Sequence, residues 1–168
     1  MKYYYGVSSK EEIFLHVKHV CDVLGYGKNK SAHILLLGTL AAETNLGTFR
    51  DNTNYSAGNG ISQFDRLPFE DIQSRVCHYH KDWVETIKEE FDIDISTVTW
   101  HSLHYSPLAS IIFARLLYKL IPDEIPSELK YIAKYWKKHY NTELGKGSED
   151  EFIKKFHEYI IIQNDLED

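Results

Sequence analysis

The sequence lacks several features that would assign it to a well-defined class of protein. Its 168 residues include only two cysteines, Cys21 and Cys77, which is too few for a disulfide framework, so we expect both thiols to be reduced. No run of eighteen apolar residues occurs, so we expect no insertion into a membrane. The formal net charge is -6, which argues against a partner that is a nucleic acid.

The N-terminal residues also lack a recognisable targeting signal. They read MKYYYGVSSKEE, without the apolar region and cleavage site of a signal peptide. We therefore expect the chain to be synthesised in the cytoplasm without a signal peptide. A protein without such a signal that acted outside the membrane would need a separate route of delivery.

Aromatic residues, by contrast, are abundant and indicate a packed core. Twelve Tyr, eight Phe and three Trp contribute to a hydrophobic content of 43%, which is more apolar surface than a disordered chain carries. The length suits one folded unit, and no repeat or linker divides the sequence. We therefore expect a single domain over residues 1–168.

The spacing of apolar residues predicts a mainly α-helical fold. Ser9 with Glu12 and Ser148 with Glu151 have the spacing of a capping box. Residues 44–65 are rich in turn-forming residues, which predicts a small β-hairpin around residues 50–63. The predicted helices cover residues 9–25, 31–43, 68–87, 107–120, 127–136 and 148–163.

The second predicted helix ends on a carboxylate, Glu43. This helix is apolar on nearly every side, which is typical of a central, buried helix. Carboxylates are rarely buried without a partner or a chemical role. Because burial raises the pKa of a carboxyl group, Glu43 is a candidate general acid, for example one that protonates a glycosidic oxygen.

Three short motifs follow one another along the chain. They are Glu43-Thr44, Gly60-Ile61-Ser62-Gln63-Phe64, and Tyr140-Asn141 followed by Gly145 and Gly147. Together they resemble the lysozyme-like superfamily, and more narrowly the soluble lytic transglycosylases found with phages and prophages. Thr44 stands where the family usually has serine, Ser62 stands where it usually has methionine, and the last motif is two residues longer before its glycines.

The resemblance implies a lysozyme-like fold whose β-hairpin lies next to a cleft, and cleavage of the MurNAc–GlcNAc β-1,4 bond of peptidoglycan strands. Glu43 would protonate the bridging oxygen, and the C6 hydroxyl of the substrate would then attack the anomeric carbon and leave a 1,6-anhydro end. No cofactor and no metal are implied. The substrate-binding residues implied are Thr44, Tyr55, Ser62, Gln63, Phe64, Tyr140 and Asn141.

Several of these residues also have a purely structural interpretation. Thr44 is expected to cap the helix or pack, and Gln63 could bond the backbone of its own loop. Phe64 could pack beneath the loop instead of stacking on a sugar. Tyr140 and Asn141 could form an ordinary helix end.

Other functions remain open from the sequence. Asp51, eight residues after Glu43, could be the second carboxylate of an inverting muramidase. The same acid could serve on a related glycan such as chitin. A virion or interaction protein could keep the fold without activity. Access to the wall would require a phage particle, a holin or a secretion machine.

A zinc site is a weaker hypothesis. The types of residue at Cys77, His78 and His80, with His101 and His104 downstream, are those that bind zinc. However, the first three fall on one predicted helix, where neighbouring residues point to different faces. We therefore predict no metal.

Overall fold

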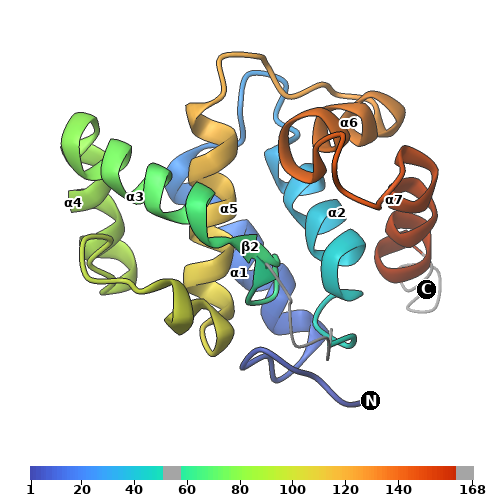
Figure 1. Ribbon diagram of the computed structural model, residues 1–168, viewed down its shortest axis with the longest axis horizontal. Helices are drawn as coiled ribbons and strands as arrows, with labels where there is room; N and C mark the ends of the chain where they lie inside the picture. The colour runs from blue at the N-terminus through green and yellow to red at the C-terminus, as the bar shows by residue number, and fades with distance from the viewer. Residues whose placement is uncertain (51–57, 162–168) are drawn as a thin grey trace.

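Seven α-helices and one two-stranded antiparallel sheet make up the part of the chain that the computed structural model describes, residues 1–50 and 58–161 (Figure 1). This confirms the prediction of a mainly α-helical chain with a small β element. The α-helices are α1 (Lys10–Leu24), α2 (Ala32–Thr44), α3 (Arg66–Tyr79), α4 (Lys81–Phe91), α5 (Pro107–Leu120), α6 (Leu129–Trp136) and α7 (Glu149–Phe156). A 3-10 helix, η1 (Trp100–His104), precedes α5, and the π-helical turns η2 (Lys137–Asn141) and η3 (His157–Ile161) extend α6 and α7.

The sheet is a short hairpin that leads directly into α3. Strand β1 (Gly58–Asn59) pairs with β2 (Phe64–Asp65), with Asn59 opposite Phe64. The hairpin was expected around residues 50–63; β1 lies within that segment, and β2 lies just beyond it. Its connection contains the Gly60–Gln63 motif.

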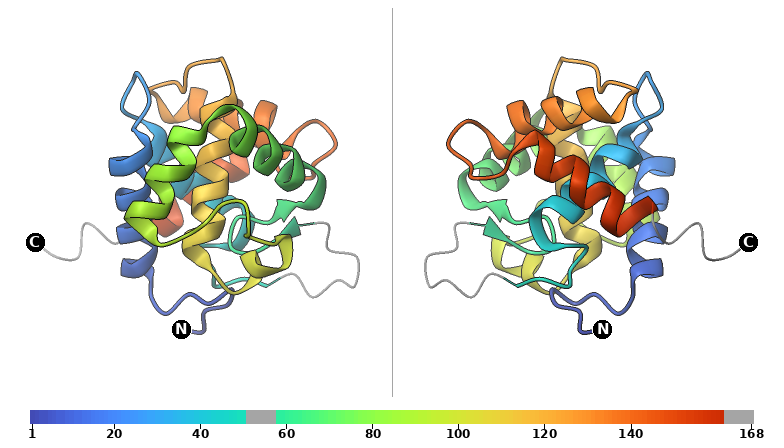
Figure 2. Two further views of the ribbon diagram at one scale, coloured as in Figure 1. Left: turned by 90° about the vertical axis from the view of Figure 1, so that its left-hand side faces the viewer. Right: turned by 90° about the vertical axis from the view of Figure 1, so that its right-hand side faces the viewer.

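Helix α2 lies at the centre of the molecule, as its apolar sequence predicts. It contacts α1 and α5 on one side and α6 and α7 on the other (Figures 1 and 2). Ser31 occupies the N-cap position but makes no side-chain cap bond. Its hydroxyl donates instead to the Ile125 carbonyl oxygen at 3.4 Å, because the loop after α5 passes over this end of α2.

The predicted helix over residues 68–87 is in fact two helices. α3 ends at Tyr79 and α4 begins at Lys81. His80 interrupts the helix with φ -129° and ψ 56°, and its ring stacks on Trp83 with centroids 3.8 Å apart. The break lets α3 pack against α5 while α4 packs against α1. The apolar spacing continues through both helices, so the sequence pattern alone does not show the break.

One cluster of buried apolar side chains joins all seven α-helices. Within the described residues, no helix combines the length and apolar character needed to cross a lipid bilayer. Helices α2 and α7 pack closely against each other. Gly38 faces the ring of Phe152, and any β-carbon at Gly38 would overlap that ring.

We expect Gly38→Ala to destabilise the protein by about 1–3 kcal/mol, because the added methyl group overpacks the interface between α2 and α7. Urea unfolding would measure the loss. The double variant Gly38→Ala/Phe152→Leu should recover part of it, since the smaller side chain makes room for the methyl group. Additive losses in the double variant would contradict this account of the contact.

Candidate active site

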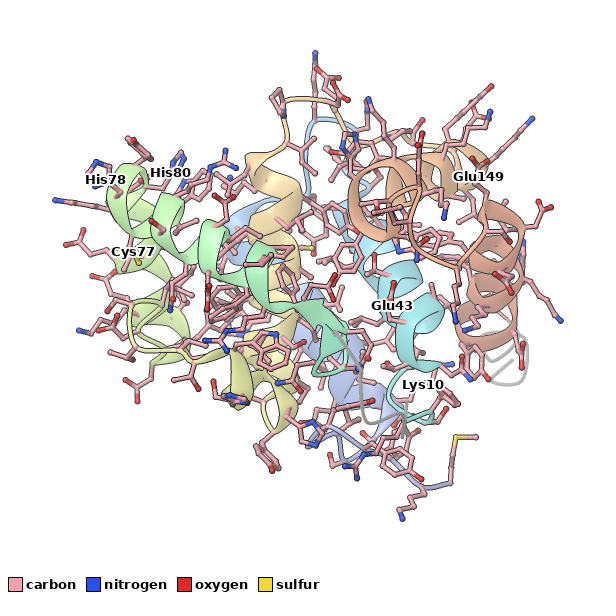
Figure 3. The ribbon with its side chains drawn as sticks, viewed as in Figure 1. Lys10, Glu43, Cys77, His78, His80 and Glu149 are labelled. Atoms are coloured by element: carbon pink, nitrogen blue, oxygen red, sulfur yellow. The ribbon has the colours of Figure 1, made fainter. Side chains whose placement is uncertain are left out.

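Glu43 lies one residue before the end of α2 and is partly buried (Figure 3). Burial raises the pKa of its carboxyl group to about 8, and the nearby Asp65 carboxylate adds to this rise. Lys155 and Trp136 act in the opposite direction. Since burial has the largest effect, the protonated form predominates at neutral pH, as a general acid requires.

Two side chains beside Glu43 can stabilise its ionised form. Lys155 of α7 is held at the end of α2 by a 2.8 Å hydrogen bond from Nζ to the Ala42 carbonyl oxygen. Trp136 of α6 is 2% exposed, and its indole N–H makes no hydrogen bond of standard geometry within the described structure. It nevertheless lies close enough to Glu43 to lower the pKa of that carboxyl. A buried donor with no good partner is rare, and the Glu43 carboxylate is the acceptor that explains it.

The sequence did not single out Trp136, Lys155 or Asp65. Asp65 directly follows the Gly60–Phe64 motif, and Trp136 comes one helical turn before Tyr140, so both lie next to residues that were predicted. Lys155 is more than one hundred residues from Glu43 in the chain, and no local pattern connects the two. Asp65 is exposed at the end of β2, and partial loss of hydration raises the pKa of its carboxyl group.

Thr44 is buried and joins the end of α2 to the hairpin. Its hydroxyl lies 2.7 Å from the Ile61 carbonyl oxygen and 3.2 Å from that of Leu40. The same oxygen accepts a 3.1 Å hydrogen bond from the Gly47 backbone N–H. Thr44 therefore fixes the loop beside Glu43, in agreement with the capping role that the sequence left open, and its side chain does not face solvent.

Tyr140 belongs to the surroundings of Glu43. Burial raises the pKa of its hydroxyl well above the usual value, and the Glu43 carboxylate raises it further. The hydroxyl donates a 2.6 Å hydrogen bond to the Ser62 carbonyl oxygen, so Tyr140 ties the segment after α6 to the hairpin. Its ring packs edge-on against Phe64.

Ser62 and Phe64 lie inside the protein and not at a surface that a substrate could reach. Ser62 is fully buried, and its hydroxyl is 2.6 Å from the Ser110 hydroxyl on α5. Phe64 is 2% exposed and also packs against Phe113. Of the two roles considered for Phe64, the structure has the packing role. Both residues therefore contribute to the site through packing and hydrogen bonds inside the protein, and not through contact with a substrate.

Gln63 does not contact Glu43 in this structure. Its side-chain amide donates to the Gly60 carbonyl oxygen at 2.9 Å and to the Tyr5 hydroxyl at 3.2 Å. Its backbone adopts a left-handed conformation with φ 47°. The side chain lines a cavity on the side of η1 and the N-terminal residues, so the bond to loop backbone that the sequence allowed is present.

Asn141 organises the turn that follows η2. Lys137 donates from Nζ to the Asn141 side-chain oxygen at 2.6 Å and to the Gly145 carbonyl oxygen at 2.9 Å. Gly147 packs directly on the Trp136 ring, where a β-carbon would lie 2.7 Å from the nearest ring atom. Asn141 thus helps to hold the turn from which Gly147 packs on the Trp136 ring.

Two predicted residues, Asp51 and Tyr55, lie outside the described residues. Among the residues that the structure does describe, no three His, Cys, Asp or Glu side chains are arranged to hold a metal ion. Cys77, His78 and His80 lie at the outer end of α3, away from Glu43 (Figure 3). Both cysteines are free thiols.

Comparisons of the chain with protein-family models, with curated proteins and with solved structures gave no match. The lysozyme-like resemblance therefore rests on the three motifs, and the chemistry rests on the surroundings of Glu43.

The Thr44 hydroxyl should contribute more to stability than a typical surface hydroxyl. Thr44→Val keeps the shape but leaves the Gly47 N–H and the Ile61 carbonyl without a partner. We expect a loss of about 1–3 kcal/mol in the free energy of unfolding. Thr48→Val is the matched control, because the one bond of the Thr48 hydroxyl within the described residues is to the Asn45 carbonyl oxygen. Equal losses in the two variants would contradict the special role of Thr44.

The Trp136 indole N–H should lower the pKa of Glu43. Trp136→Phe removes this donor and keeps an aromatic ring, so the pKa of Glu43 should rise above its present value of about 8. Carbon-13 NMR of the Glu43 carboxyl during a pH titration would measure the shift. Trp83→Phe, on α4, should leave the pKa unchanged. An unaltered Glu43 pKa in Trp136→Phe would contradict the interaction.

Glu43 should make the protein less stable at high pH. Its folded pKa of about 8 exceeds the model value of 4.5, so the stability that the protonated form contributes is lost as the pH rises through about 8. Glu43→Gln cannot ionise. The free energy of unfolding of Glu43→Gln, relative to that of wild type, should therefore increase by on the order of a few kcal/mol between about pH 4 and about pH 9. Chemical unfolding at both pH values would test this, with Glu90→Gln on the exposed face of α4 as control.

Proposed function

We propose that this protein cleaves the MurNAc–GlcNAc β-1,4 bond of peptidoglycan as a lytic transglycosylase, with Glu43 as both acid and base. The observation that carries the proposal is a carboxyl group at the end of a rigid, central helix whose burial raises its pKa to about 8. The sequence motifs supply the substrate class. Figure 3 shows where this group lies on α2.

The reaction needs one carboxyl group. Protonated Glu43 gives its proton to the bridging oxygen as the bond from that oxygen to the anomeric carbon breaks. The C6 hydroxyl oxygen of the MurNAc ring then bonds to the anomeric carbon, and its proton returns to the Glu43 carboxylate. The products are a 1,6-anhydro end and a free C4 hydroxyl, and no water is consumed.

The neighbours of Glu43 suit both halves of this cycle. Burial and the Asp65 carboxylate keep the proton on Glu43 before the reaction. Lys155 and the indole N–H of Trp136 stabilise the carboxylate that forms when the proton leaves. Because the protonated form is needed first, activity should decline as the pH rises through about 8.

Hydrolysis is the second candidate reaction, and it is supported by the position of Asp65, a second carboxylate near Glu43. An inverting muramidase needs a second carboxylate to activate water. The sequence suggested Asp51, which lies outside the described residues. Asp65 is a described carboxylate that interacts with Glu43, and it would take this role in hydrolysis.

Digestion of purified peptidoglycan, with the products read by mass spectrometry, tests the proposal. Wild type should release 1,6-anhydro ends, and Glu43→Gln should be slower by roughly 10²–10⁴-fold because it has no proton to give. Glu90→Gln should match wild type. Circular dichroism would confirm that each variant is folded.

Two other outcomes would overturn the proposal of a transglycosylase. Reducing ends in place of anhydro ends would indicate hydrolysis, and Asp65→Asn and Asp51→Asn would then identify the second carboxylate. The absence of product from folded wild type would favour a non-catalytic interaction protein, or an enzyme for another glycan such as chitin.

A further inference from the structure

A cavity with a volume of about 370 Å³ lies apart from Glu43. Three parts of the chain form it: the N-terminal segment at Tyr5, the hairpin with Arg50 before it, and η1 with the residue that follows. Glu43 does not line it. Its size is in the range of sites for small molecules.

The walls of this cavity are held together by direct backbone packing. Gly6 lies against the Tyr105 carbonyl, too close for any side chain, and Gly60 approaches the Leu103 carbonyl so that a β-carbon would be 2.5 Å from its oxygen. Both glycines have positive φ angles, which other residues rarely adopt. The N-terminal segment and the hairpin are therefore both fixed to η1.

Hydrogen bonds set the chemistry of His104 in the cavity. The Asn59 side-chain nitrogen donates to the Trp100 carbonyl oxygen at 2.8 Å, which identifies the other Asn59 atom as the oxygen. That oxygen is 3.1 Å from His104 Nδ1, so Nδ1 must carry the proton. His104 Nε2 is left for a ligand, as an acceptor when the ring is neutral and as a donor when it is charged.

The lining of the cavity is basic, although the chain as a whole carries a net charge of -6. Arg50, His101 and His104 line it, and no aspartate or glutamate does so among the described residues. The structure has no ion pair between Arg50 and a described carboxylate. Burial lowers the pKa of His104, and the positive charge of Arg50 lowers it further, so Arg50 supplies the fixed positive charge and a bound anion would favour the charged form of His104.

Aromatic rings form the rest of the wall. The indole N–H of Trp100 donates to the Phe64 carbonyl oxygen at 2.7 Å, which fixes the ring in place. Tyr105 is 77% exposed at the rim. Rings of this kind pack against the apolar faces of cyclic ligands, while hydroxyl groups of the ligand bond to groups such as the Gln63 amide oxygen.

We propose that this cavity binds a sugar acid, with the carboxylate paired to the Arg50 guanidinium and bonded by His104 in the charged form that the bound carboxylate favours, and with the sugar ring packed against Trp100 and Tyr105. A guanidinium group and a charged histidine are suited to a carboxylate, and the aromatic wall is suited to the apolar face of a ring attached to it. The inference goes beyond the proposed cleavage and does not depend on it, because a sugar acid could bind here whether or not Glu43 is catalytic.

Titrations followed by nitrogen-15 NMR would test the site with two matched pairs of ligands. Glucuronate differs from glucose, and N-acetylmuramic acid from N-acetylglucosamine, by a carboxylate-bearing group. In at least one pair, the acid should bind about tenfold or more tightly than the neutral sugar, the difference expected from one charge-assisted contact. The shifted signals should come from residues 58–63 and 100–105. Acetate, which lacks the ring, should bind more weakly than the sugar acid.

Arg50→Gln and His104→Gln should each weaken binding of the acid, Arg50→Gln by about tenfold, and should leave the neutral sugar unaffected. Arg75→Gln is the matched control, since Arg75 lies on α3 in an exposed pair with Asp71. Equal binding of acid and neutral sugar in both pairs would overturn the proposal. So would equal binding of acetate, an unaffected Arg50→Gln variant, or signals that shift around Glu43 instead.

Discussion

The site depends on the burial of the Glu43 carboxyl group at the end of α2, and the surrounding elements place their side chains around this group. An ionised carboxylate at this position would lose hydration that no full ion pair replaces. The carboxyl group stays protonated instead, and Lys155 and Trp136 lie near enough to stabilise the negative charge of the carboxylate when the proton leaves. The protein is therefore less stable at high pH, and it has a carboxyl group that can give up a proton near neutral pH.

The hairpin is held beside Glu43 from both sides. Thr44 binds the Ile61 carbonyl from the end of α2, and Tyr140 binds the Ser62 carbonyl from the segment after α6. The strands themselves have only two residues each, and an isolated hairpin is marginally stable even when it is longer. These side-chain bonds therefore define the position of the loop more than the strand pairing does.

Local patterns in the sequence predicted what depends on local interactions. The starts of α1 and α7 followed from Ser9 and Ser148, which both cap their helices as expected. The buried position of Glu43 followed from the apolar sequence of α2. The break at His80 was missed because α3 and α4 share one apolar spacing but pack against different helices. The contact of Lys155 with the end of α2 was missed because it joins residues that are distant in sequence.

Gln63 shows most clearly why a motif does not determine the direction of a side chain. Ser62 and Gln63 are adjacent, yet the carbonyl of the first is bonded by Tyr140 near Glu43, while the side chain of the second bonds Tyr5 in the basic cavity. The left-handed backbone at Gln63 turns the side chain towards η1, and the packing of Gly60 against Leu103 fixes that turn. The same five-residue motif therefore supports an acid on one side and contributes Gln63 to the cavity at Arg50 on the other. The second role depends on η1, which lies some forty residues further along the chain.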